Sequence, residues 1–347
     1  MLGVFRGSFD VIAIGTATRD VFLRSPLFKG IADAHFSEKL GFPSGIAQCF
    51  PYGGKIEVER PVVTTGGGAA NAAVTFARMG FRTAALFKIG NDARGREIVA
   101  ELKREGVTPL PVSDAKDETA YSTILLSSSG ERSILTYRGA SEDMRPADVP
   151  TERLHARWAY IAPGGIPTAT MKRIVQALKR NKVSIAINPS KRYLTLPAPE
   201  RQFFFDAASV VILNREEGAY VTGVPYADEE GIFKKMDALV GGIVALTDGA
   251  NGVSVSDGTH RYRAGIFAER KMVDRTGAGD AFGSGFVSAL IGRPTDRAAI
   301  MEAIRVGSAN ATSKVEYVGA SEGLLRRADS GSRRWRGLRV SVTPASS

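Results

Sequence analysis

The alternation of short apolar runs with helix-length segments restricts the fold of this chain more than any other feature. Helical periodicity predicts helices at residues 69–79, 93–105, 168–180 and 228–239. The apolar, β-branched runs are typical of buried strands, and they occupy residues 9–15, 83–90, 157–163, 182–189, 209–214 and 242–249. Strands that alternate with helices form parallel units covered on both faces. The sequence therefore predicts a doubly wound α/β fold with a mostly parallel sheet, whose ligands bind beyond the carboxyl ends of the strands.

Two stretches interrupt this alternation. Residues 21–63 show no long helical pattern and are rich in Gly, Pro and aromatics, and residues 119–137 resemble a hairpin that turns at "SSSGE". We expect these stretches to pair as a small β lid over the ligand site. The predicted division is a large domain at 9–20, 64–111 and 139–325, a lid at 21–63 and 112–138, and a disordered tail at 326–347.

Composition excludes several classes of function. With only Cys49 and three histidines, the chain has neither a disulfide framework nor a Cys/His zinc cluster. The net charge of +10 comes without a nucleic-acid recognition motif, and a phosphorylated small molecule needs a basic site too. No apolar run could span a bilayer and no signal peptide is apparent. We therefore expect a cytoplasmic protein with no nucleic-acid or membrane partner.

The glycine-rich turns do not match the commonest nucleotide-binding motifs. No G-x-x-x-x-G-K-[ST] occurs, and "GTATRD" follows the first strand in place of G-x-G-x-x-G. A Walker-type loop and a dinucleotide fingerprint are therefore excluded. If the chain binds a nucleotide, it uses other machinery.

The stretch "DRTGAGDAFGSGFVSAL", residues 274–290, predicts a helix that begins near Gly277 or Ala278. First-turn amides have no partner in their own helix and lie at its positive end, so they accept an anion such as a phosphoryl group. Asp280 beside them is placed to take a proton from an attacking hydroxyl. The alternative is a first-turn acid that only stabilises the helix. From the residues alone, both interpretations stay open.

This stretch and "TGGGAANAAVTFARMG", residues 65–80, resemble the two signatures of the ribokinase-like (PfkB) family of carbohydrate and nucleoside kinases. The resemblance covers roughly residues 9–321. It implies an ATP-dependent kinase that phosphorylates a hydroxyl of a small sugar or nucleoside, with Asp280 as the general base. It also implies that the amides of Gly277, Ala278 and Gly279 form an anion hole.

The resemblance assigns further residues to the nucleotide end of the site. "NREE" matches a family element in which Asn214 and Glu217 organise Mg²⁺ through water, although helix capping is the alternative for Asn214. "TDGANG" places Thr247, Gly249 and Gly252 against the nucleotide phosphates, and Asn310 is expected to border the adenine. In potassium-activated relatives, the positions of Asp274 and Thr276 contribute to a monovalent-cation loop, which carbonyls of residues 315–321 would complete.

At the acceptor end, the resemblance implies that Asp20 and Asn71 bind hydroxyl groups, and that Gly67 and Gly68 let the backbone approach the substrate. A carboxylate only accepts hydrogen bonds and suits neighbouring hydroxyls. The alternative for Asp20 is a surface loop acid. Two departures stand out: ribokinases carry Lys where Gly68 stands, and "APGGIPT" lacks the acid that ribokinases place near their sugar.

Three alternatives remain open at this point. The first is a catalytically silent sugar or nucleotide sensor on the same fold. The second is a phosphosugar kinase, for which Arg138 is the candidate cation. The third concerns assembly: the exposed edge of the lid predicts a homodimer that pairs through the lid.

Overall fold

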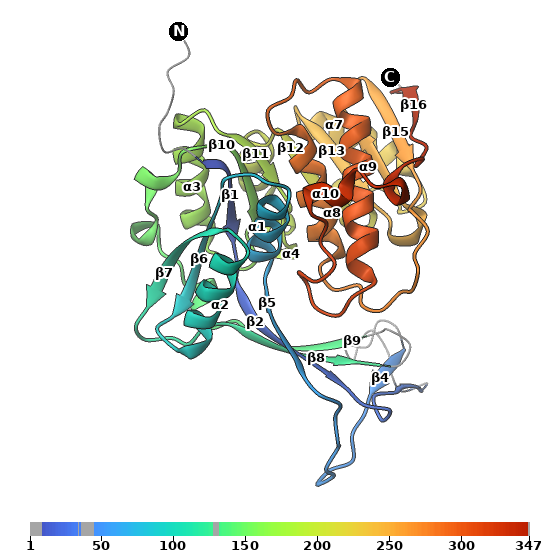
Figure 1. Ribbon diagram of the computed structural model, residues 1–347. Helices are drawn as coiled ribbons and strands as arrows, with labels where there is room; N and C mark the ends of the chain where they lie inside the picture. The colour runs from blue at the N-terminus through green and yellow to red at the C-terminus, as the bar shows by residue number, and fades with distance from the viewer. Residues whose placement is uncertain (1–8, 34, 36–44, 128–131, 346–347) are drawn as a thin grey trace.

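The computed structural model describes residues 9–33, 35, 45–127 and 132–345. Its central sheet has ten strands in the order β16-β15-β14-β13-β12-β11-β10-β1-β6-β7 (Figure 1). Seven of them pair in parallel: β1 (Phe9–Gly15), β6 (Thr83–Gly90), β7 (Thr108–Asp114), β10 (Ala156–Ala162), β11 (Ser184–Ile187), β12 (Val210–Asn214) and β13 (Ile243–Thr247). Strands β14 (Val253–Ser256), β15 (His260–Ala264) and β16 (Ser341–Pro344) extend the sheet in antiparallel fashion. The predicted α/β class is confirmed.

Helices cover both faces of this sheet and enclose two cores. Successive residues of β1 point to opposite sides, so Val11 belongs to one buried cluster and Ile12 to the other. The first cluster packs under α1 (Gly68–Arg78), α2 (Ala93–Arg104), α8 (Ala278–Leu290) and α9 (Arg297–Val315). The second packs under α3 (Thr168–Arg180), α4 (Lys191–Leu194), α5 (Ala198–Phe205), α6 (Arg215–Thr222) and α7 (Glu229–Leu239). None of the helices in the described ranges combines the length and apolar composition that crossing a membrane requires.

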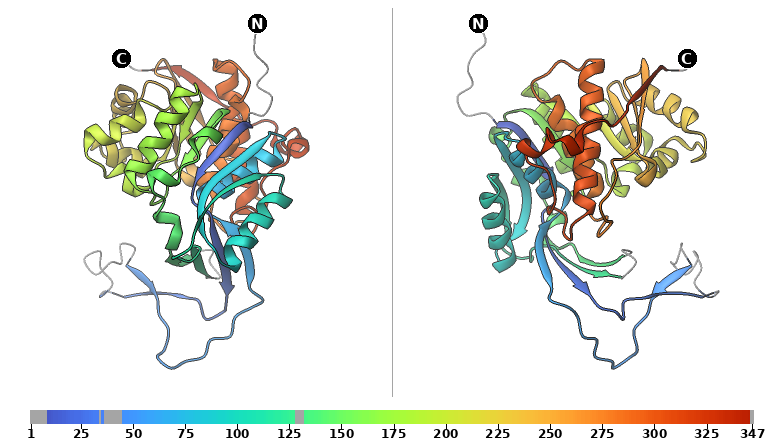
Figure 2. Two further views of the ribbon diagram at one scale, coloured as in Figure 1. Left: turned by 90° about the vertical axis from the view of Figure 1, so that its left-hand side faces the viewer. Right: turned by 45° about the vertical axis from the view of Figure 1, so that its right-hand side comes forward.

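A second sheet of four strands, in the order β5-β2-β8-β9, extends from the α/β body (Figures 1 and 2). It consists of β2 (Thr18–Arg24), β5 (Val62–Gly66), β8 (Tyr121–Leu126) and β9 (Arg132–Tyr137), and a hairpin of β3 (Gly30–Ala32) and β4 (Ile46–Gln48) continues from it. This sheet fits the expected lid. The turn predicted at "SSSGE" lies largely outside the described residues. Two boundaries differ: β2 starts before residue 21, and β7 stays in the main sheet to Asp114, past residue 111.

Short 3₁₀ segments connect several of these elements: η2 (Gly139–Glu142), η3 (Pro146–Asp148), η4 (Thr151–Arg153) and η5 (Gly249–Asn251). The segment η2 follows β9 and leads the chain from the lid back into the α/β body. The loops of η2 and η5 both become important for the site described below.

The tail was predicted to be disordered, and this prediction is wrong. Residues 326–345 contain α10 (Arg327–Ser330), η6 (Arg333–Trp335) and β16, which pairs with β15. Trp335 is buried, packs edge-on against Phe267, and its neighbour Arg334 pairs with Glu316. The prediction was based on the basic composition of this segment. It overlooked two apolar side chains, Trp335 and Val340, which are buried and anchor the segment to the α/β body.

Candidate active site

The first turn of α8 has the features of an anion-binding site. Gly277 caps the helix in the left-handed region, with φ of 78°, which glycine adopts without steric cost. The amides of Gly277, Gly279 and Asp280 have no hydrogen-bond partner within the described parts of the chain. The amide of Ala278 instead donates to the Arg275 carbonyl at 3.2 Å. The predicted anion hole is therefore corrected at one position, because closing the turn uses the Ala278 amide.

Asp280 lies next to these free amides and is held by two side-chain amides. Its Oδ2 accepts a hydrogen bond from Asn71 Nδ2 at 2.9 Å, and its Oδ1 accepts one from Asn188 Nδ2 at 3.4 Å. Burial raises the pKa of Asp280, and the hydrogen bond from Asn71 partly opposes that rise. A carboxylate with a raised pKa is a better proton acceptor than a solvated one. Asp280 is therefore not a solvated first-turn acid, because side-chain amides from α1 and from the residue after β11 hold both of its carboxylate oxygens.

Asn71 leaves one polar atom unused. Its side chain is 5% exposed, and its Oδ1 has no hydrogen-bond partner among the described residues. A buried acceptor without a partner costs free energy of roughly 1–3 kcal/mol, and a hydroxyl group of a bound molecule would satisfy it. Sequence reasoning missed Asn188, whose signal was its position directly after strand β11.

The two glycines before Asn71 stand where a side chain would collide. A Cβ on Gly68 would lie 2.6 Å from the Cβ of Ala162 and 3.4 Å from Oδ1 of Asp280. A Cβ on Gly67, whose φ is 92°, would lie 2.6 Å from the Thr16 carbonyl oxygen. The position of Ala162 therefore explains why this chain has glycine at position 68, where ribokinases carry lysine. A lysine at this position would have to displace Ala162.

Asp20 is not a surface loop acid. It lies in β2, where it is 6% exposed, and its Oδ1 accepts from Thr18 Oγ1 at 2.8 Å. Burial raises its pKa, while hydrogen bonds from Thr18 and Ser122 act in the opposite direction. A Cβ on Gly66 would meet its Oδ2, so Asp20 lies against the strand that leads into Gly67 and α1.

Glu142, from η2, supplies an acid that the sequence analysis did not find. "APGGIPT" carries no acid of its own, but a Cβ on Gly165 in this loop would collide with the Glu142 carboxylate. The neighbouring Gly164 packs in the same way against Thr16, close to Gly67. Glu142 also forms an ion pair with Arg138 at 3.0 Å. The acid and the loop are far apart in sequence, so spacing gave no signal.

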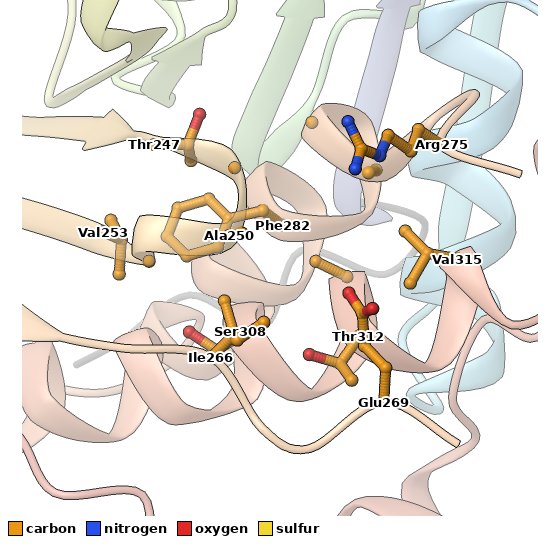
Figure 3. Close-up of a pocket in the computed structure, with 15 residues that line it drawn as sticks. Thr247, Ala250, Val253, Ile266, Glu269, Arg275, Phe282, Ser308, Thr312 and Val315 are labelled. Atoms are coloured by element: carbon orange, nitrogen blue, oxygen red, sulfur yellow. The ribbon is translucent and has the colours of Figure 1, made fainter. Parts of the chain in front are cut away.

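A cavity of about 290 Å³ opens beside the first turn of α8. Five predicted residues line it, namely Thr247, Gly249, Gly252, Ala278 and Gly279. Its remaining lining is apolar at Ala250, Val253, Ile266, Phe282, Ala311 and Val315 and polar at Glu269, Arg275, Ser308 and Thr312 (Figure 3). A cavity with apolar walls and an anion site at one end suits a flat base that carries phosphates.

Asn310 does not border this cavity, so its predicted role is wrong. It is completely buried, donates to the Ala281 carbonyl at 2.8 Å and to Thr75 Oγ1 at 3.3 Å, and accepts from the Leu325 amide at 2.8 Å. It thereby joins α8, α1 and the segment after α9. The cavity is lined instead by Ser308, Ala311 and Thr312, because residues three and four apart share one face of a helix.

Asn214 and Glu217 form a reciprocal capping box at the start of α6. Asn214 Oδ1 accepts from the Glu217 amide, and Glu217 Oε2 accepts from the Asn214 amide, both at 2.8 Å. Asn214 also lies beside Thr247 in the register of β12 and β13, which places the box next to the cavity. Burial raises the pKa of Glu217, and its Oε1 takes no part in the capping box. The described residues hold no cluster of three metal-ligating side chains. A single carboxylate beside a single amide fits Mg²⁺, because this ion keeps several of its waters and binds phosphate oxygens as well.

The loop predicted to hold a monovalent cation contains a lysine ammonium instead. Asp274 is completely buried and accepts from the amides of Thr276 at 2.9 Å and Gly319 at 3.2 Å. Lys314, also completely buried, places its Nζ 2.8 Å from the Asp274 carbonyl oxygen and 3.5 Å from Asp274 Oδ2. Burial lowers the pKa of Lys314 to about 8, and the charge of Asp274 opposes that shift. The prediction for Asp274 and Thr276 is thereby corrected.

Comparison with known proteins places this chain in a family. The model of the pfkB family of carbohydrate kinases matches residues 40–327. The chain is 29% identical to a ribokinase of Haemophilus influenzae, covering 76% of this chain and 85% of the relative. It is 28% identical to a cytidine kinase of Thermococcus kodakarensis, covering 72% of this chain and 86% of the relative.

A solved structure shares the fold. The structure of Arabidopsis thaliana ribokinase complexed with ribose and ATP superposes with a TM-score of 0.75, at 22% identity, over 95% of this chain and 99% of that one. The family model covers most of the sequence, and it includes both signature segments around Asn71 and Asp280. This chain therefore belongs to the pfkB family of carbohydrate kinases.

Proposed function

We propose that this kinase transfers the γ-phosphoryl group of ATP to a hydroxyl of a small sugar or nucleoside, with Asp280 as the general base. One observation carries the proposal. The Asp280 carboxylate accepts a hydrogen bond from Asn71 Nδ2 at 2.9 Å, and Asn71 Oδ1 has no partner among the described residues. The amides of Gly277, Gly279 and Asp280, at the start of the same helix, are also free within the described parts of the chain. A phosphoryl group at the amides and a hydroxyl at Asn71 would therefore meet beside a proton acceptor.

The chemistry follows from this placement. The acceptor hydroxyl loses its proton to Asp280 as its oxygen attacks phosphorus, and the free amides stabilise the charge that develops on the phosphoryl oxygens. Asn71 and Asn188 keep the carboxylate oriented toward the hydroxyl. Magnesium, held through water by Glu217 and Asn214, would neutralise phosphate charge when bound.

The cavity beside α8 is our proposed nucleotide site. Its apolar walls, such as Ile266 and Val315, suit the two faces of a base. Arg275 lines the same cavity next to Ala278 and Gly279, so its guanidinium is placed to pair with the phosphates. This residue lies inside the signature stretch, but its role does not follow from the glycine pattern.

The acceptor side favours an uncharged polyol over a phosphosugar. Asp20, Glu142 and the Oδ1 of Asn71 are all hydrogen-bond acceptors, as neighbouring hydroxyl groups require. Arg138, the cation that a phosphosugar kinase would use, already pairs with Glu142. A dianionic phosphate would have to separate this pair.

A coupled ATPase assay on a panel of sugars, nucleosides and sugar phosphates tests the function. We expect turnover with a neutral sugar or nucleoside, at a rate that the Asp280→Asn variant lacks. Binding of ATP and of an acceptor, measured by calorimetry, with no phosphorylated product would instead support the sensor alternative. Turnover restricted to sugar phosphates would support the phosphosugar alternative.

We also infer that two copies pair through their lids. The lid sheet exposes Val63, Ile134 and Leu135, at 46%, 46% and 61% of their surface. Exposed apolar side chains on an open sheet are a natural pairing surface. Light scattering should report a dimer for the native chain, and Leu135→Lys should shift it to monomer. A native monomer at micromolar concentration would contradict this inference.

A further inference from the structure

The Lys314 ammonium occupies the interior of the loop that supports the anion hole. Lys314 lies in the last turn of α9, and neither it nor Asp274 has solvent-exposed side-chain surface. Its Nζ faces three oxygen atoms: the Asp274 carbonyl at 2.8 Å, the Tyr317 carbonyl at 3.4 Å and Asp274 Oδ2 at 3.5 Å. An ammonium group has three donors and no acceptor, so this surrounding of oxygens satisfies it.

A short stretch of backbone, residues 273–277, connects the contacts of Lys314 to the anion hole. The amides of Val273 and Asp274 both donate to the Val315 carbonyl, at 2.8 and 3.1 Å. Gly277 packs on the segment that follows α9, and a Cβ added to Gly277 would lie 3.1 Å from the Ala320 carbonyl oxygen. The segments 273–277 and 315–320 therefore close around one positive charge, and the free amides begin three residues beyond Asp274.

We propose that Lys314 is a tethered replacement for a monovalent metal ion, so that the anion hole of this kinase is held in place without potassium. A single positive charge surrounded by one carboxylate oxygen and two carbonyl oxygens is also what a potassium ion would provide. The two cannot share the position, because the ammonium already lies among those oxygens. The effect on turnover rests on the proposed function, whereas the occupancy of the loop does not.

The alternative is that Lys314 and Asp274 form an ordinary buried ion pair with no link to cation chemistry. The two hypotheses differ in one consequence. If the loop needs a monovalent positive charge, removing the lysine side chain leaves a space lined by the oxygens of Asp274 and Tyr317. A monovalent cation that binds there then restores function. If the pair is only structural, no added ion restores anything.

The experiment compares the native chain with Lys314→Ala in choline chloride, sodium chloride and potassium chloride at equal ionic strength. Two quantities are measured: kcat/KM for the acceptor found in the panel, and the midpoint of thermal unfolding. For the native chain we expect both to be the same in all three salts. For Lys314→Ala in choline we expect kcat/KM to fall roughly tenfold or more, with a lower unfolding midpoint, and potassium to restore both.

Two further variants serve as controls. Lys179→Ala removes an exposed lysine from the last turn of another helix, α3, and should respond to no salt. Lys314→Met with Asp274→Asn removes both charges and fills the space, so it should fold without potassium and gain nothing from it. This double variant keeps the test valid if Lys314→Ala does not fold in choline.

Native activity that rises severalfold with potassium would overturn the proposal, and so would a Lys314→Ala variant that potassium restores in neither quantity. Soaking Lys314→Ala crystals in rubidium chloride gives a direct readout, an anomalous peak expected beside Asp274. The unfolding midpoint and the rubidium peak do not depend on turnover. They therefore test the loop even if no acceptor is phosphorylated and the proposed function fails.

Discussion

The proposed nucleotide end and the proposed acceptor end of this site are built in different ways. The nucleotide end is mostly backbone: the free amides of α8 and the glycines of the turn after β13 come from two short, continuous segments. The proposed acceptor end consists of side chains from four separate parts of the chain, with Asp20 on β2, Asn71 on α1, Glu142 on η2 and Asn188 after β11. Among the described residues, we assign Asp280 to both ends. Under the proposed function, local backbone geometry positions the phosphoryl group, and tertiary packing selects the acceptor.

The largest expected effect comes from the residue that the two ends share. Asp280→Asn keeps the size of the side chain but cannot accept a proton, so we expect kcat to fall on the order of 10³-fold. The Kd for ATP, measured by calorimetry, should change little because the free amides remain. Asn310→Ala, which alters a buried residue outside the cavity, serves as the control for a purely structural defect. Near-native turnover of Asp280→Asn would refute the assignment of the base.

The difference between the two ends also explains which parts of the fold and of the site the sequence could predict. The strands, the helices and the anion-hole turn follow from hydrophobic periodicity and from a continuous glycine motif, both of which are local. Glu142 gave no signal, because only the folded chain brings η2 to Gly165. The position of Asn188 after β11 marked it as a candidate, but did not reveal its contact with Asp280. The loop "APGGIPT" carries no acid of its own, and Glu142 from η2 lies against it.

Two wrong predictions have the same physical origin. Asn310 and the cation loop were assigned from their position in a pattern, which does not report where a side chain points. Asn310 lies on the buried face of α9, and Lys314, four residues later on the same helix, reaches the Asp274 carbonyl. A lysine in a helical run is usually solvated, so no sequence signal distinguished this one.

The second prediction tests the acceptor end alone. Asp20→Ala removes a buried carboxylate that we expect to bind hydroxyl groups of the acceptor, and the loss of one charged hydrogen bond costs about 1.5–3 kcal/mol. The KM for the acceptor should rise roughly 10- to 100-fold, while the KM for ATP stays within a factor of about two. Steady-state kinetics with each substrate varied in turn measures both. An equal rise in the two KM values would break the division between the ends.

The third prediction tests the nucleotide end alone. Arg275→Ala should raise the KM for ATP roughly tenfold through the loss of one phosphate contact, and should leave the KM for the acceptor unchanged. Arg293→Ala is a matched control, because this arginine is also exposed and lies just after the other end of α8. An Arg275→Ala variant that binds ATP like the Arg293→Ala control would remove Arg275 from the phosphate site.

The smallest effect concerns the pH dependence of Asp280, where the two ends meet. The base must be ionised to act, so kcat/KM should fall as the pH drops through its pKa in the folded protein, which burial raises above the ordinary value. The Asn71 hydrogen bond favours the ionised form and lowers that pKa. Asn71→Ala should therefore move the acid limb of the kcat/KM profile to higher pH, apart from any loss of acceptor binding.

Asn188→Ala is the internal comparison for that shift. Its hydrogen bond to Asp280 is 3.4 Å long, against 2.9 Å for Asn71, so the weaker contact should move the limb less. A limb that both variants leave in place would mean that neither amide tunes the carboxylate. A limb that moves only in Asn71→Ala would assign control of the base to α1, the helix that also presents the free Oδ1 to the acceptor. Binding the acceptor and setting the proton affinity of the base would then depend on the same side chain.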